Sequence, residues 1–305
     1  MEERFFSPVD IVENISPKRF KYEYLYKEKP VVIRGLWNDY PAVKKWTVSY
    51  FKEQLGNIEV GVFDGRMQKE DRSFKQPHRK MKFAEYLDTI TSDKNSDLRL
   101  FLFNIFKHKP ELKNDFSYPP FTRFYLKIPF MFFGGKNSRV RIHQDMDWSN
   151  VFLTQLYGRK EVFLFHPKYS KLLYKYPFGV HSSVNLDQPD YIKYPGLKYV
   201  KGLHCIMEPG DTLFMPSGHW HYIKYLDGGY AINQRALSPR PRRWLHGLWN
   251  VTVLSNLDDL FRKLFGNRWF DYKIKRTREN ANKAIKKLQN NGNQGDSSVI
   301  EPNPV

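Results

Sequence analysis

The sequence has a single cysteine and no long apolar run. Cys205 stands alone among 305 residues, so the chain forms no internal disulfide and suits a reducing compartment. No stretch approaches the ~18 consecutive apolar residues that a membrane-spanning helix needs. The first twenty residues carry charges where a secretory signal has an apolar core. We therefore expect a cytoplasmic protein without a membrane span.

Acidic residues are scarce relative to basic ones. The chain has 50 Lys and Arg against 32 Asp and Glu, which gives a formal net charge of +18. Half of the surplus lies between Ser238 and Gln289, where 13 basic residues face 4 acidic ones. Such a bias attracts polyanions such as nucleic acid or acidic proteins, or it is only a well-solvated basic surface. Composition leaves both interpretations open.

The order of the predicted elements indicates a mainly β protein. Short β-branched and aromatic runs, separated by Gly and Pro turns, are typical of a jelly-roll barrel. Helical spacing is confined to the flanks and to the end of the chain. The strands are predicted at 31–34, 98–106, 124–133, 139–145, 151–156, 161–165, 203–207, 212–215, 221–226 and 230–234, and helices at 46–55, 81–90, 244–254, 257–265 and 269–288.

This pattern predicts three parts. Residues 1–240 form the barrel domain with an N-terminal α/β extension, and residues 241–289 form basic C-terminal helices. Residues 290–305 are rich in Gly, Asn, Ser and Pro, and we expect them to be a disordered tail.

A His-x-Asp motif supplies the first candidate metal ligands. His143 and Asp145 flank Gln144 on a predicted strand, so their side chains point to one face. Two histidines and one carboxylate on one face of an octahedron hold non-haem iron(II) in oxygenases, with positions left open. One more histidine must therefore come from another strand. In MPSGHWHYI, both His219 and His221 have the required strand parity, so periodicity leaves the choice open.

Lys160 is a candidate for binding an organic acid. It follows the turn Gly158-Arg159 and directly precedes the strand predicted at 161–165, where a buried ammonium group would pair with a carboxylate. The alternative is a solvated lysine in a hairpin. The histidine-aspartate motif upstream favours the buried interpretation.

Three blocks together resemble a known family. The segments IHQD, GRKEVFLFHP and EPGDTLFMPSGHWHYI, in that order, are similar to the JmjC and cupin-like Fe(II)- and 2-oxoglutarate-dependent oxygenases. The resemblance covers roughly residues 30–240 and implies a double-stranded β-helix (jelly-roll, cupin) core with flanking α-helices. It also implies Fe(II) as cofactor, with 2-oxoglutarate and O2 as co-substrates.

The resemblance assigns roles to particular residues. The family's metal ligands fall on His143, Asp145 and His221, because its Trp-His pair matches Trp220-His221. Its co-substrate lysine falls on Lys160, and its strand-initial asparagine is best matched by Asn150. Two positions depart from the pattern: a co-substrate tyrosine of the family is Phe101 here, and a threonine is Val140. No catalytic residue beyond the metal ligands is implied.

The implied activity is hydroxylation of a substrate C–H bond, and we expect the substrate to be a protein side chain. The segment VNLDQPDYIKYPGL resembles tRNA-modifying members of the family, so an RNA nucleoside is the alternative. A non-catalytic cupin that only binds its ligand is a third interpretation. The apolar stripe of the C-terminal helices either forms a homodimer or packs on its own barrel; it comprises Trp244, Leu248, Leu257, Leu260, Phe261 and Leu264.

Overall fold

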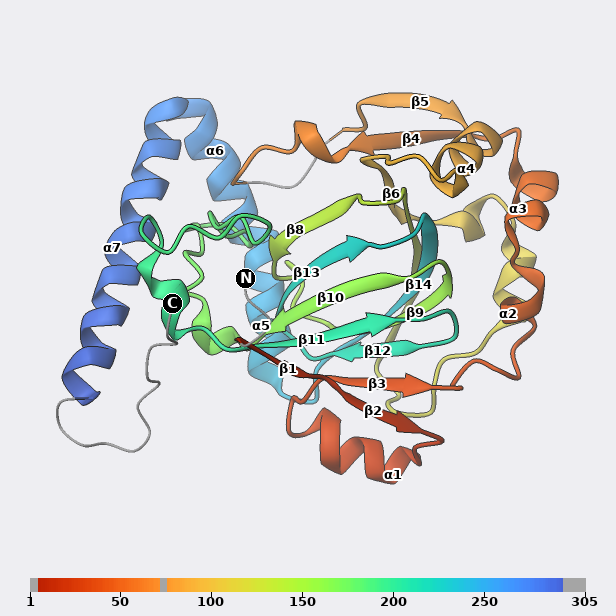
Figure 1. Ribbon diagram of the computed structural model, residues 1–305, viewed down its shortest axis with the longest axis horizontal. Coiled ribbons are helices and arrows are strands. Elements are labelled where there is room, and N and C mark those ends of the chain that lie inside the picture. Colours follow the sequence, from red (N-terminus) through yellow and green to blue (C-terminus); the bar gives the residue numbers. More distant parts are fainter. Residues whose placement is uncertain (1–4, 72–75, 293–305) are drawn as a thin grey trace.

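The computed structural model describes residues 5–71 and 76–292, and its strands form two sheets within those ranges (Figure 1). The smaller sheet has the order β1-β11-β10-β13-β8 and the larger one β2-β3-β12-β9-β14-β7-β6-β4-β5. The strands are β1 (Phe6–Pro8), β2 (Asp10–Glu13), β3 (Val31–Arg34), β4 (Glu59–Asp64), β5 (Arg79–Lys82), β6 (Leu98–Phe103), β7 (Tyr125–Gly134), β8 (Arg139–His143), β9 (Asn150–Tyr157), β10 (Lys160–Phe165), β11 (Gly202–Met207), β12 (Thr212–Met215), β13 (Trp220–Tyr225) and β14 (Gly229–Ala236).

The helices lie around this barrel. Figure 1 shows α6 and α7 on one side of the barrel and α2, α3 and α4 on the opposite side. The helices are α1 (Pro17–Phe20), α2 (Pro41–Lys45), α3 (Val48–Leu55), α4 (Phe83–Thr91), α5 (Pro241–Trp249), α6 (Ser255–Phe265) and α7 (Asn267–Gly292). The π-helices are η2 (Lys21–Leu25) and η8 (Asn250–Leu254), and the 3-10 turns are η3 (Gly65–Met67), η4 (Ile105–Lys107), η5 (Pro110–Asp115), η6 (Pro167–Tyr169) and η7 (Pro195–Tyr199).

The mainly β core and its flanking helices confirm the predicted fold class. The antiparallel pair β10–β13 lies in the smaller sheet and the pairs β9–β14 and β7–β14 lie in the larger one, and apolar side chains from both sheets pack together in one core. A second apolar core lies under α3 and α4 and includes the buried ring of Phe133. Both cores follow from the alternation of apolar residues along strands with one face inward.

Several element boundaries differ from the sequence prediction. Met81 belongs to β5, and α4 begins at Phe83, because the basic loop pairs with β4 before the helix starts. β6 ends at Phe103, and a 3-10 turn follows at Ile105–Lys107. β8 ends at His143, so Asp145 lies in the loop just beyond the strand.

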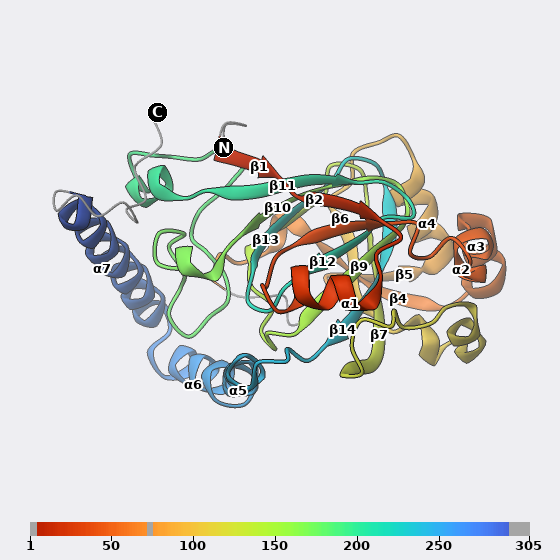
Figure 2. The same ribbon diagram turned by 90° about the horizontal axis from the view of Figure 1, so that it is seen from below.

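The C-terminal helices extend beyond the predicted ranges at both ends. α5 starts at Pro241, and α7 runs to Gly292, three residues into the expected disordered tail. Residues 293–305 lie outside the described ranges. In both views α7 lies along the loops between β10 and β11, and Ala281 and Ile285 pack in their apolar core (Figure 2). None of the described helices combines the length and apolar character required to cross a bilayer.

Candidate metal centre

Two neighbouring strands bring the candidate histidines face to face. β8 and β13 pair antiparallel with His143 directly opposite His221, and the two imidazole centroids are 4.2 Å apart. Asp145 follows the end of β8, and one ligand atom from each of the three residues lies within 4.8 Å of the others. Such a spacing matches side chains that converge on one ion. His143 and Asp145 are partly exposed to the cavity, and His221 is buried.

The electrostatics of this cluster favour a cation. Burial and the neighbouring His221 hold the pKa of His143 well below its ordinary value, so this imidazole is neutral with a free lone pair. Burial alone would raise the pKa of Asp145, but Arg235 and the two histidines outweigh it and lower the pKa to about 2. Neutral imidazoles and an ionised carboxylate are the protonation states that metal binding requires.

Arg235 orients the carboxylate, a role that no sequence pattern indicated. Its guanidinium, on β14, donates to Asp145 Oδ1 at 3.2 Å and lies 2.8 Å from Asp147 Oδ1. Asp147, two residues beyond Asp145, lies outside the three-residue cluster, and its carboxylate pairs with the same guanidinium.

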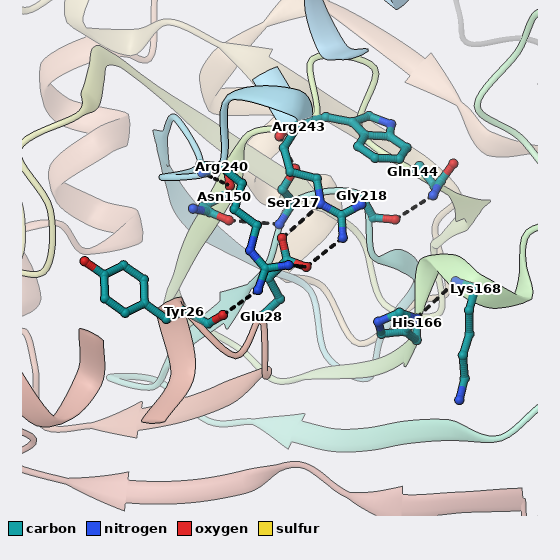
Figure 3. A network of polar contacts seen from close by, with 12 residues as sticks. Tyr26, Glu28, Gln144, Asn150, His166, Lys168, Ser217, Gly218, Arg240 and Arg243 are labelled. Atoms are coloured by element: carbon teal, nitrogen blue, oxygen red, sulfur yellow. Dashed lines mark hydrogen bonds and ion pairs between the residues drawn. The ribbon is translucent and has the colours of Figure 1, made fainter. Parts of the chain in front are cut away.

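The side chains of Gln144 and Asn150 hold the turn before β13 in place (Figure 3). Gln144 points away from the cluster, as predicted, and its amide donates to the carbonyl of Gly218. The backbone N–H of Ser217 donates to Asn150 Oδ1 at 2.9 Å. Gly218 has φ +74°, a conformation that glycine adopts without strain. These bonds set where β13 begins and hence where His221 points.

Asn150 is directed away from the cavity. Leu153 of the same strand lines the cavity, and Val151 packs with it in the core between the sheets, so Asn150, of opposite parity, faces the other side. The sequence match was one residue out of register, and a one-residue slip in a strand reverses the face. A direct co-substrate contact of Asn150 therefore has no geometric support. Asn233 on β14 does line the cavity, and its buried Oδ1 has no hydrogen-bond partner among the described residues.

A cavity of about 560 Å³ extends from the cluster into the barrel. Lys160 lies in its wall, 1% exposed, and its Nζ is 4.5 Å from the centre of the Tyr225 ring. Burial lowers the pKa of Lys160 to about 7. Within residues 5–71 and 76–292, no carboxylate pairs with this ammonium group. A buried cation facing a cavity without its own anion fits the distal carboxylate of a keto acid.

The C-terminal segment forms part of the cavity wall, a feature the sequence did not reveal. Val251 of η8 lines the cavity, and Asn250 Nδ2 donates to the carbonyl of Met146 at 3.2 Å. Gly247 of α5 packs so closely on the Asp147 carbonyl that a Cβ there would lie 1.9 Å from the oxygen. The loop that carries Asp145 is therefore fixed against the C-terminal helices.

The other histidines lie outside the cluster. His219 is buried beside His166, with ring centroids 5.5 Å apart, and does not join the three ligand atoms. Burial lowers its pKa to about 3. Of the two candidates in MPSGHWHYI, His221 alone converges with His143 and Asp145 among the described residues.

Comparison with known proteins agrees with this geometry. Residues 17–235 match the family described as "Cupin-like domain". The chain is therefore a member of the cupin-like domain family, and its relatives are JmjC oxygenases, which use Fe(II), 2-oxoglutarate and O2. The His-Asp-His set and Lys160 fit that chemistry.

Two relatives illustrate the range of the family. The chain is 29% identical to lysine-specific demethylase 8 of Xenopus tropicalis over 228 residues, covering 72% of this chain and 50% of the relative. It is 27% identical to tRNA wybutosine-synthesizing protein 5 of Homo sapiens over 252 residues, covering 74% and 76%. The chain spans about half the length of the demethylase.

Proposed function

We propose that the protein is an Fe(II)- and 2-oxoglutarate-dependent hydroxylase whose substrate is a protein side chain. His143, Asp145 and His221 would hold the iron, and Lys160 would bind the distal carboxylate of 2-oxoglutarate. The observation that carries the proposal is the convergence of three ligand atoms within 4.8 Å beside a cavity with an unpaired buried ammonium group.

The bound iron and keto acid would supply the oxidising chemistry, in which O2 and 2-oxoglutarate give succinate, carbon dioxide and a hydroxylated substrate carbon. The protein's own residues bind and orient. Arg235 keeps the Asp145 carboxylate ionised and aimed at the metal position. Lys160 fixes the keto acid in one direction. Phe101, Phe130 and Phe132 line the cavity and keep water away from the reacting atoms.

The mouth of the cavity supports a protein substrate. Ile128 is 56% exposed, Leu102 48% and Val251 45%, and all three line the cavity. Exposed apolar side chains around a pocket favour contact with another protein or an apolar side chain. Arg235 and Lys160 are the two Lys or Arg residues among the described cavity-lining residues, and two carboxylates neutralise Arg235.

Mn(II) binding and turnover test the proposal. We expect the wild type to bind one Mn(II) and to convert 2-oxoglutarate into succinate, and His143→Ala to lose both. His108→Ala, an exposed histidine far from the cluster, is the control and should behave as wild type. Succinate formation that survives in His143→Ala would refute the assignment. Metal binding without any turnover would favour a non-catalytic cupin.

An RNA nucleoside is the second candidate substrate. One face of α7 exposes a row of cations that would follow a phosphate backbone. The residues are Arg268, Lys275, Arg276, Arg278, Lys283, Lys286 and Lys287. A transfer RNA should then bind with an affinity that falls steeply between 50 and 200 mM salt, on the order of 10³-fold. Indifference to RNA at low salt would exclude this candidate.

We further propose a homodimer formed through the C-terminal helices. Only part of the predicted apolar stripe is covered by its own chain. Phe261 packs on Phe178 and Trp269. Leu248 is 54% exposed and Leu264 is 64% exposed. The exposed part, with Trp249, is an apolar surface that a second copy would bury. Analytical ultracentrifugation should give a dimer mass for the wild type and a monomer mass for Leu264→Glu.

We also propose a cytoplasmic location. The support is the absence of a second cysteine, together with the burial of Cys205 in β11. Cell fractionation with compartment markers tests this proposal, and recovery in a secreted or membrane fraction would refute it.

A further inference from the structure

A second hollow lies outside the barrel, between η2 and the segment that leads into β7. Its volume is about 660 Å³. The argument concerns six of the residues that line it, which together we name the basic groove: Lys18, Lys21, Tyr22, Tyr26, Arg123 and Phe124. α1 directly precedes η2, and Figure 2 shows it close to the end of the barrel where β7 and β14 lie.

Local helix geometry explains why cations and aromatic rings share this face. Lys18, Lys21 and Tyr22 have the i, i+3, i+4 spacing of one helical side. The backbone N–H of Tyr26 donates to the Lys21 carbonyl at 3.0 Å, a π-helical bond that brings residues five apart together. Lys21 Nζ consequently lies 5.3 Å from the centre of the Tyr26 ring, and the Tyr22 and Tyr26 rings meet edge to face.

The groove carries uncompensated positive charge. Lys18, Lys21 and Arg123 are all exposed, none forms an ion pair with a described residue, and no carboxylate lines the hollow. The two nearby acids are already engaged. Glu23 pairs with Arg19, and Glu28 is buried between Arg240 and Arg243 (Figure 3). A ligand with negative charge would therefore meet three free cations.

The aromatic surfaces of the groove are also exposed. Tyr22 is 56% exposed and Phe124 47%, and the Arg123 guanidinium lies 5.2 Å from the Phe124 ring centre. Grooves lined by aromatic rings bind extended chains, such as polyproline II segments and other flat groups. The ligand class that fits is an extended chain with acidic groups beside flat or proline-like ones.

β7 joins the groove to the cavity. The Leu237 N–H donates to the Phe124 carbonyl at 2.9 Å, so the pairing with the β14 chain continues back to Phe124. Phe124, Leu126 and Ile128 have the same strand parity, and Leu126 and Ile128 line the cavity. Two residues of strand span about 7 Å. The groove thus opens within a few residues of the entrance to the metal centre.

The path between groove and metal favours a peptide over a nucleic acid strand. It passes Leu126, Ile128 and Leu102, which offer no charge to a phosphate backbone, and it reaches Asp147 at the cavity wall. Moreover, β6 pairs with β7 only as far as Met131, so the outer side of β7 before Met131 has no strand partner among the described residues. An extended peptide matches an open strand edge.

We propose that the basic groove binds an acidic, extended segment of the protein substrate, adjacent in sequence to the residue that enters the metal centre. The inference rests on the proposed function, because it assumes a protein substrate. It adds a property of that substrate: glutamate or aspartate with proline or an aromatic residue, a few positions from the hydroxylated residue.

Fluorescence anisotropy of a labelled 14-residue peptide of alternating glutamate and proline with one tyrosine tests the proposal without turnover. We expect saturable binding that weakens about tenfold or more in Lys21→Glu/Arg123→Glu, since two attractive surface contacts become repulsive. Lys94→Glu/Lys113→Glu, the same charge change at exposed sites outside the groove, should bind as wild type. A lysine-for-glutamate peptide should not bind. Unchanged thermal unfolding midpoints would show that both double variants fold.

Other outcomes would overturn the inference. Equal affinity of the two double variants for the acidic peptide would remove the groove from recognition. Binding of a 14-nucleotide oligouridylate that depends on Lys21 and Arg123, without peptide binding, would assign the groove to RNA. Peptide binding in a protein that forms no succinate would leave the groove in place and refute only the hydroxylase function. Succinate formation with a normal KM for an acidic substrate in Lys21→Glu/Arg123→Glu would refute the role of the groove and leave the hydroxylase function standing.

Discussion

Arg235 and Asp145 are joined by a hydrogen-bonded ion pair of 3.2 Å at the edge of the metal centre, and both side chains are more than four-fifths buried. The two residues are 90 positions apart in the chain. The pair keeps the carboxylate ionised and limits its rotation. Asp145 therefore depends on β14 for its function as well as on its own loop.

Arg235→Met should weaken metal binding. Loss of the guanidinium removes the partner that lowers the Asp145 pKa and fixes its direction, and loss of such a supporting contact costs about 10- to 100-fold in metal affinity. Titration with Mn(II), followed by electron paramagnetic resonance, measures the change. Arg159→Met removes an exposed pair with Asp227 and is the matched control. Wild-type Mn(II) affinity in Arg235→Met would contradict this role.

Binding of 2-oxoglutarate should take up a proton above pH 7. Burial lowers the pKa of Lys160 to about 7, so at pH 8 this amine is mostly neutral before the dianion arrives and charged afterwards. Affinity should be steady below about pH 7 and fall by up to about tenfold per pH unit above it. Calorimetry at pH 8 in two buffers with different ionisation enthalpies measures the uptake.

Lys160→Met tests whether Lys160 is the group that takes up the proton. The variant should lose proton uptake and most of its 2-oxoglutarate affinity, whereas Lys168→Met, at an exposed lysine, should keep both. Proton uptake that persists in Lys160→Met would assign it to another group.

Gly247→Ala should destabilise the packing of α5 against the metal centre. A Cβ at this position would lie 1.9 Å from the Asp147 carbonyl oxygen, so the helix or the loop must shift. We expect a loss of about 1–3 kcal/mol in the free energy of unfolding. Gly179→Ala is the control, because its nearest atom would be 3.6 Å away. Urea denaturation compares the two, and equal midpoints would refute the tight contact.

Asp71→Asn should detach the C-terminal helices from the barrel. Asp71 accepts hydrogen bonds from Arg262 of α6 and from the fully buried Lys273 of α7, so its loss leaves only Asp258, which belongs to α6 itself, to pair with these two cations. Removing one partner of a buried pair costs up to about 3–5 kcal/mol. Asp227→Asn, in the exposed pair with Arg159, should cost less than about 1 kcal/mol.

The Asp71 carboxylate also makes the free energy of unfolding depend on pH. Burial raises the Asp71 pKa, but Lys273 and Arg262 outweigh this effect and lower it below its ordinary value. The stabilisation is therefore complete above about pH 4, the unfolded pKa, and is lost as pH falls through the lower folded pKa. The difference in unfolding free energy between wild type and Asp71→Asn should shrink below pH 4. A constant difference down to pH 2 would contradict this linkage.

Sequence patterns located the local features of the site. His143 and Asp145 are two residues apart, and Lys160 begins a strand, so short-range spacing carried their prediction. The choice between His219 and His221 needed the family resemblance, because both have the same parity. Spacing could not predict which distant residues contact the site. Arg235 and Val251 reach it only because β14 and η8 fold back beside the loop after β8.

Asn150 shows the limit of matching by position. Its place at the start of the next strand matched the family's asparagine, but a one-residue difference in register along a strand reverses the face. Asn233 was not predicted, and its inward parity on β14 is the signal that could have identified it.

Val251 lies beyond the family match, which ends at residue 235, yet it lines the cavity. The barrel carries the metal ligands, and the segment after it completes the entrance. Changes in the C-terminal helices can therefore alter which substrates enter the cavity while the metal ligands stay the same. Proteins that share this barrel but differ after its last strand would then differ in selectivity with no change in their chemistry.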